Sequence, residues 1–148
     1  YPLDAILHWN RGYGKKGFIQ YQFVLPLEAK EGLVEILKQI SAKGIGSFLA
    51  VLKVFGEQES MISFPQKGYT LALDIPVRKG LFEFLDELDE VVLQYGGRLY
   101  MSKDARMKPE VLKAGYPRLQ EFKNIVQLYN PDGKFRSMQS DRLLLTTD

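Results

Sequence analysis

The chain of 148 residues has no cysteine and only one histidine, His8. It can therefore form neither a disulfide nor a thiolate metal site, and one histidine is too few for a zinc centre or a Ser-His-Asp triad. We predict no metal site. The lack of cysteine leaves the compartment open, so both a cytoplasmic and a membrane-peripheral location stay possible.

A strong charge of one sign and long apolar runs are also missing. The 20 basic side chains are nearly balanced by 18 acidic ones, so the net charge of +2 gives no sign of a nucleic-acid partner. We find no run of about eighteen apolar residues and no signal segment, and predict no transmembrane segment. The chain begins with Tyr1-Pro2 rather than methionine, so we expect a fragment or a processed product.

Apolar residues make up 45% of the chain, which is enough for the core of one domain. Residues 12–17 match the G-x-G-x-x-G pattern of dinucleotide-binding loops letter for letter. Such a loop must follow a strand and open a helix, whereas here a strand pattern follows the glycines. We therefore reject a dinucleotide loop.

Hydrophobic periodicity predicts the order strand, helix, strand, strand, helix, strand. The strands are expected at 18–25, 48–55 and 69–75, with a short last one through Leu99 and Met101, and the helices at 27–42 and 80–95. Further helical material is predicted from Lys108 to Asn130, with a break at Tyr116-Pro117. In the second helix the predicted solvent face comprises Glu83, Asp86, Glu87, Asp89 and Glu90.

This order is typical of the ferredoxin-like (βαββαβ) fold of the α+β class. It predicts an antiparallel four-stranded sheet with two helices on one face, plus a C-terminal helical extension. We divide the chain into a linker (1–16), a ferredoxin-like domain (17–106) and the helical extension and tail (107–148). The tail contains Leu143-Leu144-Leu145, which needs a surface to pack against.

The sheet face turned away from the helices is predicted to be unusually neutral. It would carry Gln20, Gln22, Thr70, Ala72 and Tyr100, and the second strand is apolar on both faces apart from Lys53. Amides that donate and accept hydrogen bonds, beside an aromatic ring, suit a hydroxyl-rich ligand such as a sugar. We expect this face to meet a ligand or another domain. A homodimer interface, or cover by the C-terminal helix, is the alternative.

The stretch 97–106 ends the last strand and places Lys103, Asp104 and Arg106 within four positions. Such an ending either presents fixed charge beyond the sheet edge or forms a solvated local ion pair.

Several segments of the chain together form a recognisable pattern. They are Trp9-Asn10-Arg11-Gly12-Tyr13-Gly14, Gly17-Phe18-Ile19-Gln20-Tyr21-Gln22-Phe23-Val24, Lys53-Val54-Phe55-Gly56, Gly97-Arg98-Leu99-Tyr100-Met101-Ser102-Lys103-Asp104-Ala105-Arg106 and Tyr116-Pro117-Arg118. This pattern resembles the C-terminal part of FAD-dependent oxidoreductases of the vanillyl-alcohol-oxidase superfamily. The resemblance is greatest to the decaprenylphosphoryl-β-D-ribose oxidase group.

The resemblance implies that an FAD-binding domain precedes this region and that 17–106 is the substrate, or cap, domain over the flavin. It implies a flavin-side lysine at Lys103 with Tyr100 as its neighbour, and a substrate pocket formed by Gln20, Gln22 and Lys53. Thr70 and Ala72 depart from the pattern, because close relatives tend to have Asn and Cys there. The pocket would therefore be smaller or differently polar.

The implied activity is oxidation of a secondary alcohol of a sugar or of a polyprenyl-phosphate sugar, with hydride transfer to flavin N5. FAD would be bound mainly by the preceding domain, and Lys103 would stabilise the developing negative charge. Asp104 or Arg106 could fix the position of Lys103, and a reductase partner could complete an epimerisation. The fragment alone is expected to be inactive.

Two other classes of function have the same element order. A stand-alone ferredoxin-like ligand-binding or dimerisation module without catalysis would form a stable dimer that binds a small molecule. An RNA-binding sheet ranks last, because Tyr21 and Phe23 are predicted on the helix side and the charge is nearly balanced.

Overall fold

The computed structural model describes residues 7–8, 11 and 14–146. Most of the predicted linker, including the Trp9-Asn10 and Gly12-Tyr13 parts of the family pattern, lies outside the described residues.

The described chain contains a four-stranded antiparallel sheet with the strand order β2-β3-β1-β4. Its strands are β1 (Phe18–Pro26), β2 (Ala50–Phe55), β3 (Gly68–Pro76) and β4 (Arg98–Leu99). The crossovers contain η3 (Leu27–Ala29) with α1 (Lys30–Ala42), and α2 (Leu81–Gln94). This arrangement confirms the predicted α+β fold class, and the strand order is that of a ferredoxin-like sheet.

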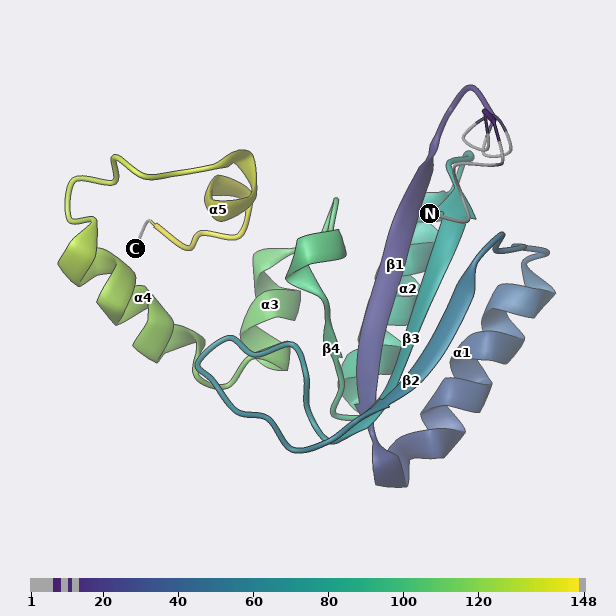
Figure 1. The fold of residues 1–148 in the computed structure, drawn as a ribbon, viewed down its shortest axis with the longest axis horizontal. Coiled ribbons are helices and arrows are strands. Elements are labelled where there is room, and N and C mark those ends of the chain that lie inside the picture. The colour runs from purple at the N-terminus through teal and green to yellow at the C-terminus, as the bar shows by residue number, and fades with distance from the viewer. Residues whose placement is uncertain (1–6, 9–10, 12–13, 147–148) are drawn as a thin grey trace.

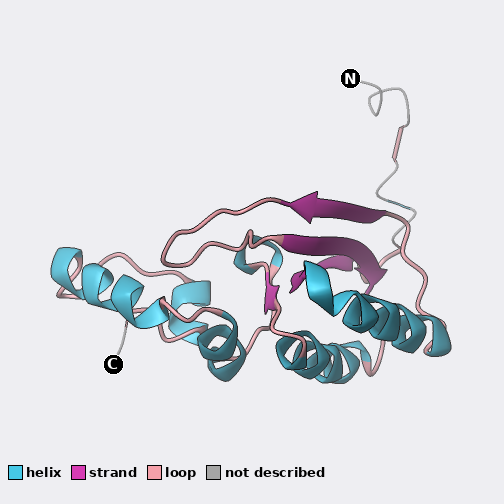
Figure 2. Ribbon diagram, turned by 90° about the horizontal axis from the view of Figure 1, so that it is seen from below, coloured by secondary structure: helices cyan, strands magenta, loops and turns pink. Residues whose placement is uncertain are grey.

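Both crossover helices cover the same face of the sheet, as Figures 1 and 2 show. Alternation places every second side chain of β1 and β3 on this face, where they meet the apolar stripes of the helices. The resulting core contains Tyr21, Phe23 and Leu25 of β1, Leu71, Leu73 and Ile75 of β3, Leu33, Ile36 and Ile40 of α1, and Leu81, Leu85, Leu88 and Val92 of α2. The other set of strand side chains faces the side that these two helices leave open.

The C-terminal extension continues past the β4 edge as η4 (Met101–Lys103), α3 (Pro109–Gly115), α4 (Leu119–Tyr129) and α5 (Met138–Arg142). The buried Tyr116 anchors it by donating a hydrogen bond from its hydroxyl to the carbonyl oxygen of Leu99. Figures 1 and 2 show α4 and α5 beside the sheet rather than over its open face. In the described part of the chain, the C-terminal helices therefore do not cover that face.

Three details differ from the sequence predictions. The last strand is shorter than expected, because Met101 lies in the 3₁₀ turn η4 rather than in β4. Strand β2 is an exposed edge, with Leu52 58% and Val54 62% exposed despite their apolar side chains. Of the three tail leucines, Leu143 is buried and Leu144 is exposed.

Among the described helices, none combines the length and the apolar composition needed to cross a bilayer.

Candidate functional site

Two glutamines on β1 form a polar row with β3 on the open face. The antiparallel register pairs Gln20 with Asp74, and the Gln20 Nε2 donates to Asp74 Oδ1 over 2.8 Å. The Gln22 Nε2 donates to Thr70 Oγ1 over 3.0 Å, and the Thr70 hydroxyl donates in turn to the carbonyl oxygen of Phe23 over 2.8 Å. The row therefore ties the two central strands together through side chains as well as through the backbone.

The chemistry of the partners determines which way each amide points. A carboxylate oxygen only accepts at neutral pH, so Gln20 must turn its NH₂ group toward Asp74. The single hydroxyl proton of Thr70 goes to Phe23, so this oxygen must accept from the NH₂ group of Gln22. The side-chain oxygens (Oε1) of both glutamines accept no hydrogen bond from the described residues. They remain available to a ligand.

These side chains line a hollow of about 100 Å³ on the open face. Its lining residues are Gln20, Gln22, Leu49, Val51, Lys53, Thr70, Ala72, Asp74 and Lys103. Thr70 and Ala72 are buried and form part of its floor, whereas Lys53 is exposed on β2 opposite Thr70. Six of the seven predicted site residues thus meet around one hollow, although they come from β1, β2, β3 and η4.

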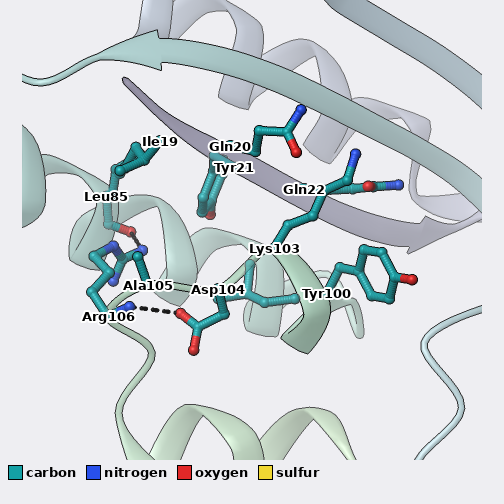
Figure 3. A pocket seen from close by; sticks show the side chains of 11 residues that line it. Ile19, Gln20, Tyr21, Gln22, Leu85, Tyr100, Lys103, Asp104, Ala105 and Arg106 are labelled. Carbon is teal, nitrogen blue, oxygen red and sulfur yellow. Dashed lines mark hydrogen bonds between the residues drawn. The ribbon is translucent and has the colours of Figure 1, made fainter. Parts of the chain in front are cut away.

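Lys103 reaches the hollow from the end of η4. Figure 3 shows its side chain extending from this turn toward β1, beside Gln22. The residue is half-buried, and its ammonium group has no hydrogen-bond or ion-pair partner among the described residues. A half-buried cation without a protein partner is suited to a negative charge supplied from outside the chain.

Tyr100 is the predicted site residue that does not line this hollow. It shares a smaller cavity of about 20 Å³ with Gln22 and Lys103 (Figure 3). Its ring stacks on Phe64 at a centroid distance of 4.4 Å, and Phe64 contacts Phe55 edge to face at 5.9 Å. The structure therefore places Tyr100 in an aromatic cluster next to the hollow.

Asp104 and Arg106 do not form the expected contacts with Lys103. The Asp104 carboxylate accepts from the backbone N–H groups of Arg106 and Met107, at 2.8 and 2.6 Å. The Arg106 guanidinium instead pairs with Asp86 and Asp89 on α2, at 2.5 and 2.7 Å. Neither charge is solvated, so the alternative of a solvated local ion pair is also wrong.

The prediction that Asp89 lies on the solvent face of α2 is wrong, because this residue is only 1% exposed. Its carboxylate accepts hydrogen bonds from Arg106 and from the Tyr21 hydroxyl. Burial raises the pKa of Asp89, against the opposing hydrogen bonds from Arg106. Burial also raises the pKa of Tyr21 well above its usual value, and the charge of Asp89 raises it further. This buried network joins β1, α2 and the segment after η4.

Two features of the site were missed in the sequence. Asp74 was not among the predicted site residues, yet it lines the hollow and accepts a hydrogen bond from Gln20. The i, i+3 spacing of Asp86 and Asp89, followed by Arg106, was the available signal for the buried network. A charge pattern alone does not reveal which acidic residues of an amphipathic helix are buried.

Comparison with known proteins gives two informative matches. The chain is 46% identical over 146 residues, or 98% of its length, to decaprenylphosphoryl-beta-D-ribose oxidase of Mycolicibacterium smegmatis. It is 33% identical over 130 residues, or 86% of its length, to a Streptomyces coelicolor protein described as an uncharacterized protein in the mprA 5′ region. No protein-family model matches the chain.

The first match confirms the resemblance drawn from the motifs, since it extends over nearly the whole chain. The chain spans only about a third of the length of these relatives, 32% and 35% respectively.

Proposed function

We propose that this chain is the substrate-binding cap domain of an FAD-dependent oxidoreductase that oxidises a secondary alcohol of a sugar or of a sugar-phosphate lipid. The observation that carries the proposal is the meeting of Gln20, Gln22, Lys53 and Lys103 around one hollow. The family pattern assigns these residues to the substrate pocket and the flavin side. The chain is 46% identical, over 98% of its length, to decaprenylphosphoryl-beta-D-ribose oxidase, and this similarity supports the same class of substrate.

The residues of the hollow suit such a ligand. The two glutamine oxygens accept hydrogen bonds from sugar hydroxyls, and the ammonium groups of Lys53 and Lys103 attract a phosphate or another negative charge. Thr70 and Ala72 set the size and polarity of the floor, which would tune the substrate relative to enzymes with Asn and Cys there.

FAD fits this chain as a group held mainly by another domain. A hollow of about 100 Å³ is small beside the pockets of roughly 300–1,000 Å³ that enclose drug-sized ligands. The chain would therefore supply one wall of a larger site. When bound, FAD would accept the hydride released by the alcohol carbon.

Lys103 is the residue that would serve the flavin. Its unpaired ammonium group would stabilise the negative charge that develops on the flavin when it accepts the hydride. Tyr100 would lie at the edge of this site, in the aromatic cluster with Phe64.

Exposed apolar surface supports a partner domain in the same polypeptide. None of the residues of the amphipathic helix α4 is buried. Leu128, Tyr129, Phe135 and Met138 are 71–91% exposed. Exposed apolar side chains concentrated in one part of the chain in this way favour an interaction site. We assign it to the FAD-binding domain, with 107–148 as the extension that packs against it.

The proposal is tested on the complete polypeptide that carries this chain, purified with its flavin. After anaerobic mixing with a polyprenyl-phosphate sugar, loss of flavin absorbance reports hydride transfer. Lys103→Ala should slow this step by roughly 100-fold or more, the usual effect of removing one pre-organised charge-stabilising donor. Lys113→Ala removes an exposed lysine of α3 away from the hollow and should leave the rate unchanged.

Three results would count against the proposal. A complete polypeptide that purifies without flavin would exclude the oxidoreductase. An unchanged rate in the Lys103→Ala protein would remove this residue from the chemistry. A chain that dimerises alone and binds sugars without flavin would favour the stand-alone ligand-binding module instead.

A further inference from the structure

The turn that carries Lys103 has little structure of its own. Strand β4 contains only two residues, and η4 is a single 3₁₀ turn of three residues, a conformation with poor hydrogen-bond geometry. A side chain on such a turn is held in one place only if other parts of the chain fix the turn.

Helix α5 lies against this turn although it follows it by more than thirty residues in the sequence. The Gln139 Nε2 donates to the carbonyl oxygen of Met101 at the start of η4, over 2.6 Å. Arg142 donates from Nη2 to Asp104 Oδ2 over 2.8 Å and from Nη1 to the carbonyl oxygen of Met107. Two side chains of α5 therefore bind the segment on both sides of Lys103.

Asp104 makes the contact with Arg142 rigid. Its side chain is only 6% exposed, and its other carboxylate oxygen accepts from the N–H groups of Arg106 and Met107. Hydrogen bonds to an ionised and nearly buried carboxylate are among the stronger ones in proteins. Arg142 therefore binds the residue that directly follows Lys103 in the chain.

Helix α5 is itself fixed in place. Ser137 caps it with a reciprocal pair of hydrogen bonds to Ser140. The next residue after the helix, Leu143, is 2% exposed within the core. The helix can therefore act as a support for η4 rather than a loose tail.

We propose that Gln139 and Arg142 are positioning residues that hold Lys103 in its working place. The inference rests on the proposed function, because it assigns the C-terminal tail a part in the reaction of Lys103. Neither residue lines the hollow, so neither is expected to touch the substrate.

The test compares Arg142→Met with Arg136→Met in the complete polypeptide. Arg136 is a matched control, because it pairs with Asp141 of α5 and, among the described residues, forms no hydrogen bond or ion pair with η4. The rate of amide hydrogen exchange in a peptide covering 100–107 reports how firmly η4 is held in its folded conformation. The rate of flavin reduction and the substrate Kd report function separately.

We expect Arg142→Met to accelerate exchange in 100–107 and to slow flavin reduction by about 10- to 100-fold, the scale of a misplaced reacting group. The substrate Kd should change little, and Arg136→Met should change neither readout. In a Lys103→Ala background, Arg142→Met should alter the rate by no more than about twofold, because its effect acts through Lys103. Arg142→Lys should recover part of the rate.

The two proposals fail in different ways. Unchanged exchange in the Arg142→Met protein would overturn the inference whatever Lys103 does. Faster exchange with an unchanged rate would also overturn it, provided that Lys103→Ala itself is slow. If Lys103→Ala keeps full activity, Lys103 has no part in the chemistry and the inference falls with that assignment, whereas a polypeptide that holds no flavin would end the proposed function itself.

Discussion

Replacing Arg106 by methionine tests the buried charge network behind the site. Methionine keeps most of the length of the side chain but removes the guanidinium that pairs with Asp89 and Asp86. The side chain of Asp89 is only 2% exposed, so its charge would be left with the Tyr21 hydroxyl as its remaining partner in this network.

The expected cost follows from this burial. Removing one partner of a buried ion pair costs about 3–5 kcal/mol, because the other charge stays uncompensated. The total free energy of unfolding of a small domain is only about 5–15 kcal/mol. With a urea slope of about 2 kcal/mol per molar, the midpoint should fall by about 2 M. Equilibrium urea denaturation followed by circular dichroism measures this shift.

A second substitution shows whether the cost comes from the stranded charge. Asp89→Asn removes the charge but keeps an acceptor for Tyr21, so the double variant Arg106→Met/Asp89→Asn should be more stable than the sum of the single changes by at least about 1 kcal/mol. Strict additivity would refute the reasoning, as would an Arg106→Met protein with the stability of the parent.

The same variant should show a distinct pH dependence. Burial already raises the pKa of Asp89 from its ordinary value of 3.8, and the loss of Arg106 removes the main opposing interaction. Just above pH 3.8, Asp89 in the folded state then keeps a proton that the unfolded state releases. The contribution of this residue is therefore complete below that pH and is lost as the pH rises through the raised pKa. This contribution of residue 89 to the pH dependence of the unfolding free energy should be absent from the double variant.

Two further substitutions test the sheet. Thr70→Val should lower the unfolding free energy by about 1–3 kcal/mol, because it leaves the Gln22 amide and the carbonyl oxygen of Phe23 without their shared hydroxyl; a change below about 0.5 kcal/mol would contradict the assigned bonds. Gly97→Ala should cost at least about 2 kcal/mol in a denaturation assay, since the new Cβ would lie 2.4 Å from the carbonyl oxygen of Val24. Gly46→Ala is its control, because that site has open space, and equal stability of the two proteins would exclude the clash.

The fold could be predicted because its signals are local. Strand alternation with period two assigns Gln20 and Gln22 to one face and Tyr21 and Phe23 to the other, and the structure has them there. The positions of the two crossover helices could likewise be predicted from their apolar stripes. The shared face of Gln20, Gln22, Thr70 and Ala72 followed from the same alternation, whereas Lys53 and Lys103 were assigned to the site by the family resemblance.

The parts that could not be predicted depend on contacts between distant segments. Whether Asp89 faces solvent is decided by Arg106 and Tyr21, which come from other elements. The early end of β4 places Met101 in a turn that receives a hydrogen bond from Gln139. Neither contact leaves a periodic signal in the sequence.

The direction of the two glutamine amides has a consequence for turnover. Each NH₂ group uses one N–H for a hydrogen bond within the sheet, and this leaves the side-chain oxygens of both glutamines turned toward a ligand as acceptors. For a sugar whose reacting hydroxyl donates to one of them, conversion to a ketone removes that donor and with it a hydrogen bond of about 0.5–1.5 kcal/mol. The ketone product would then bind less tightly than the alcohol substrate. The same glutamine hydrogen bonds that join β1 to β3 would therefore also favour release of the product.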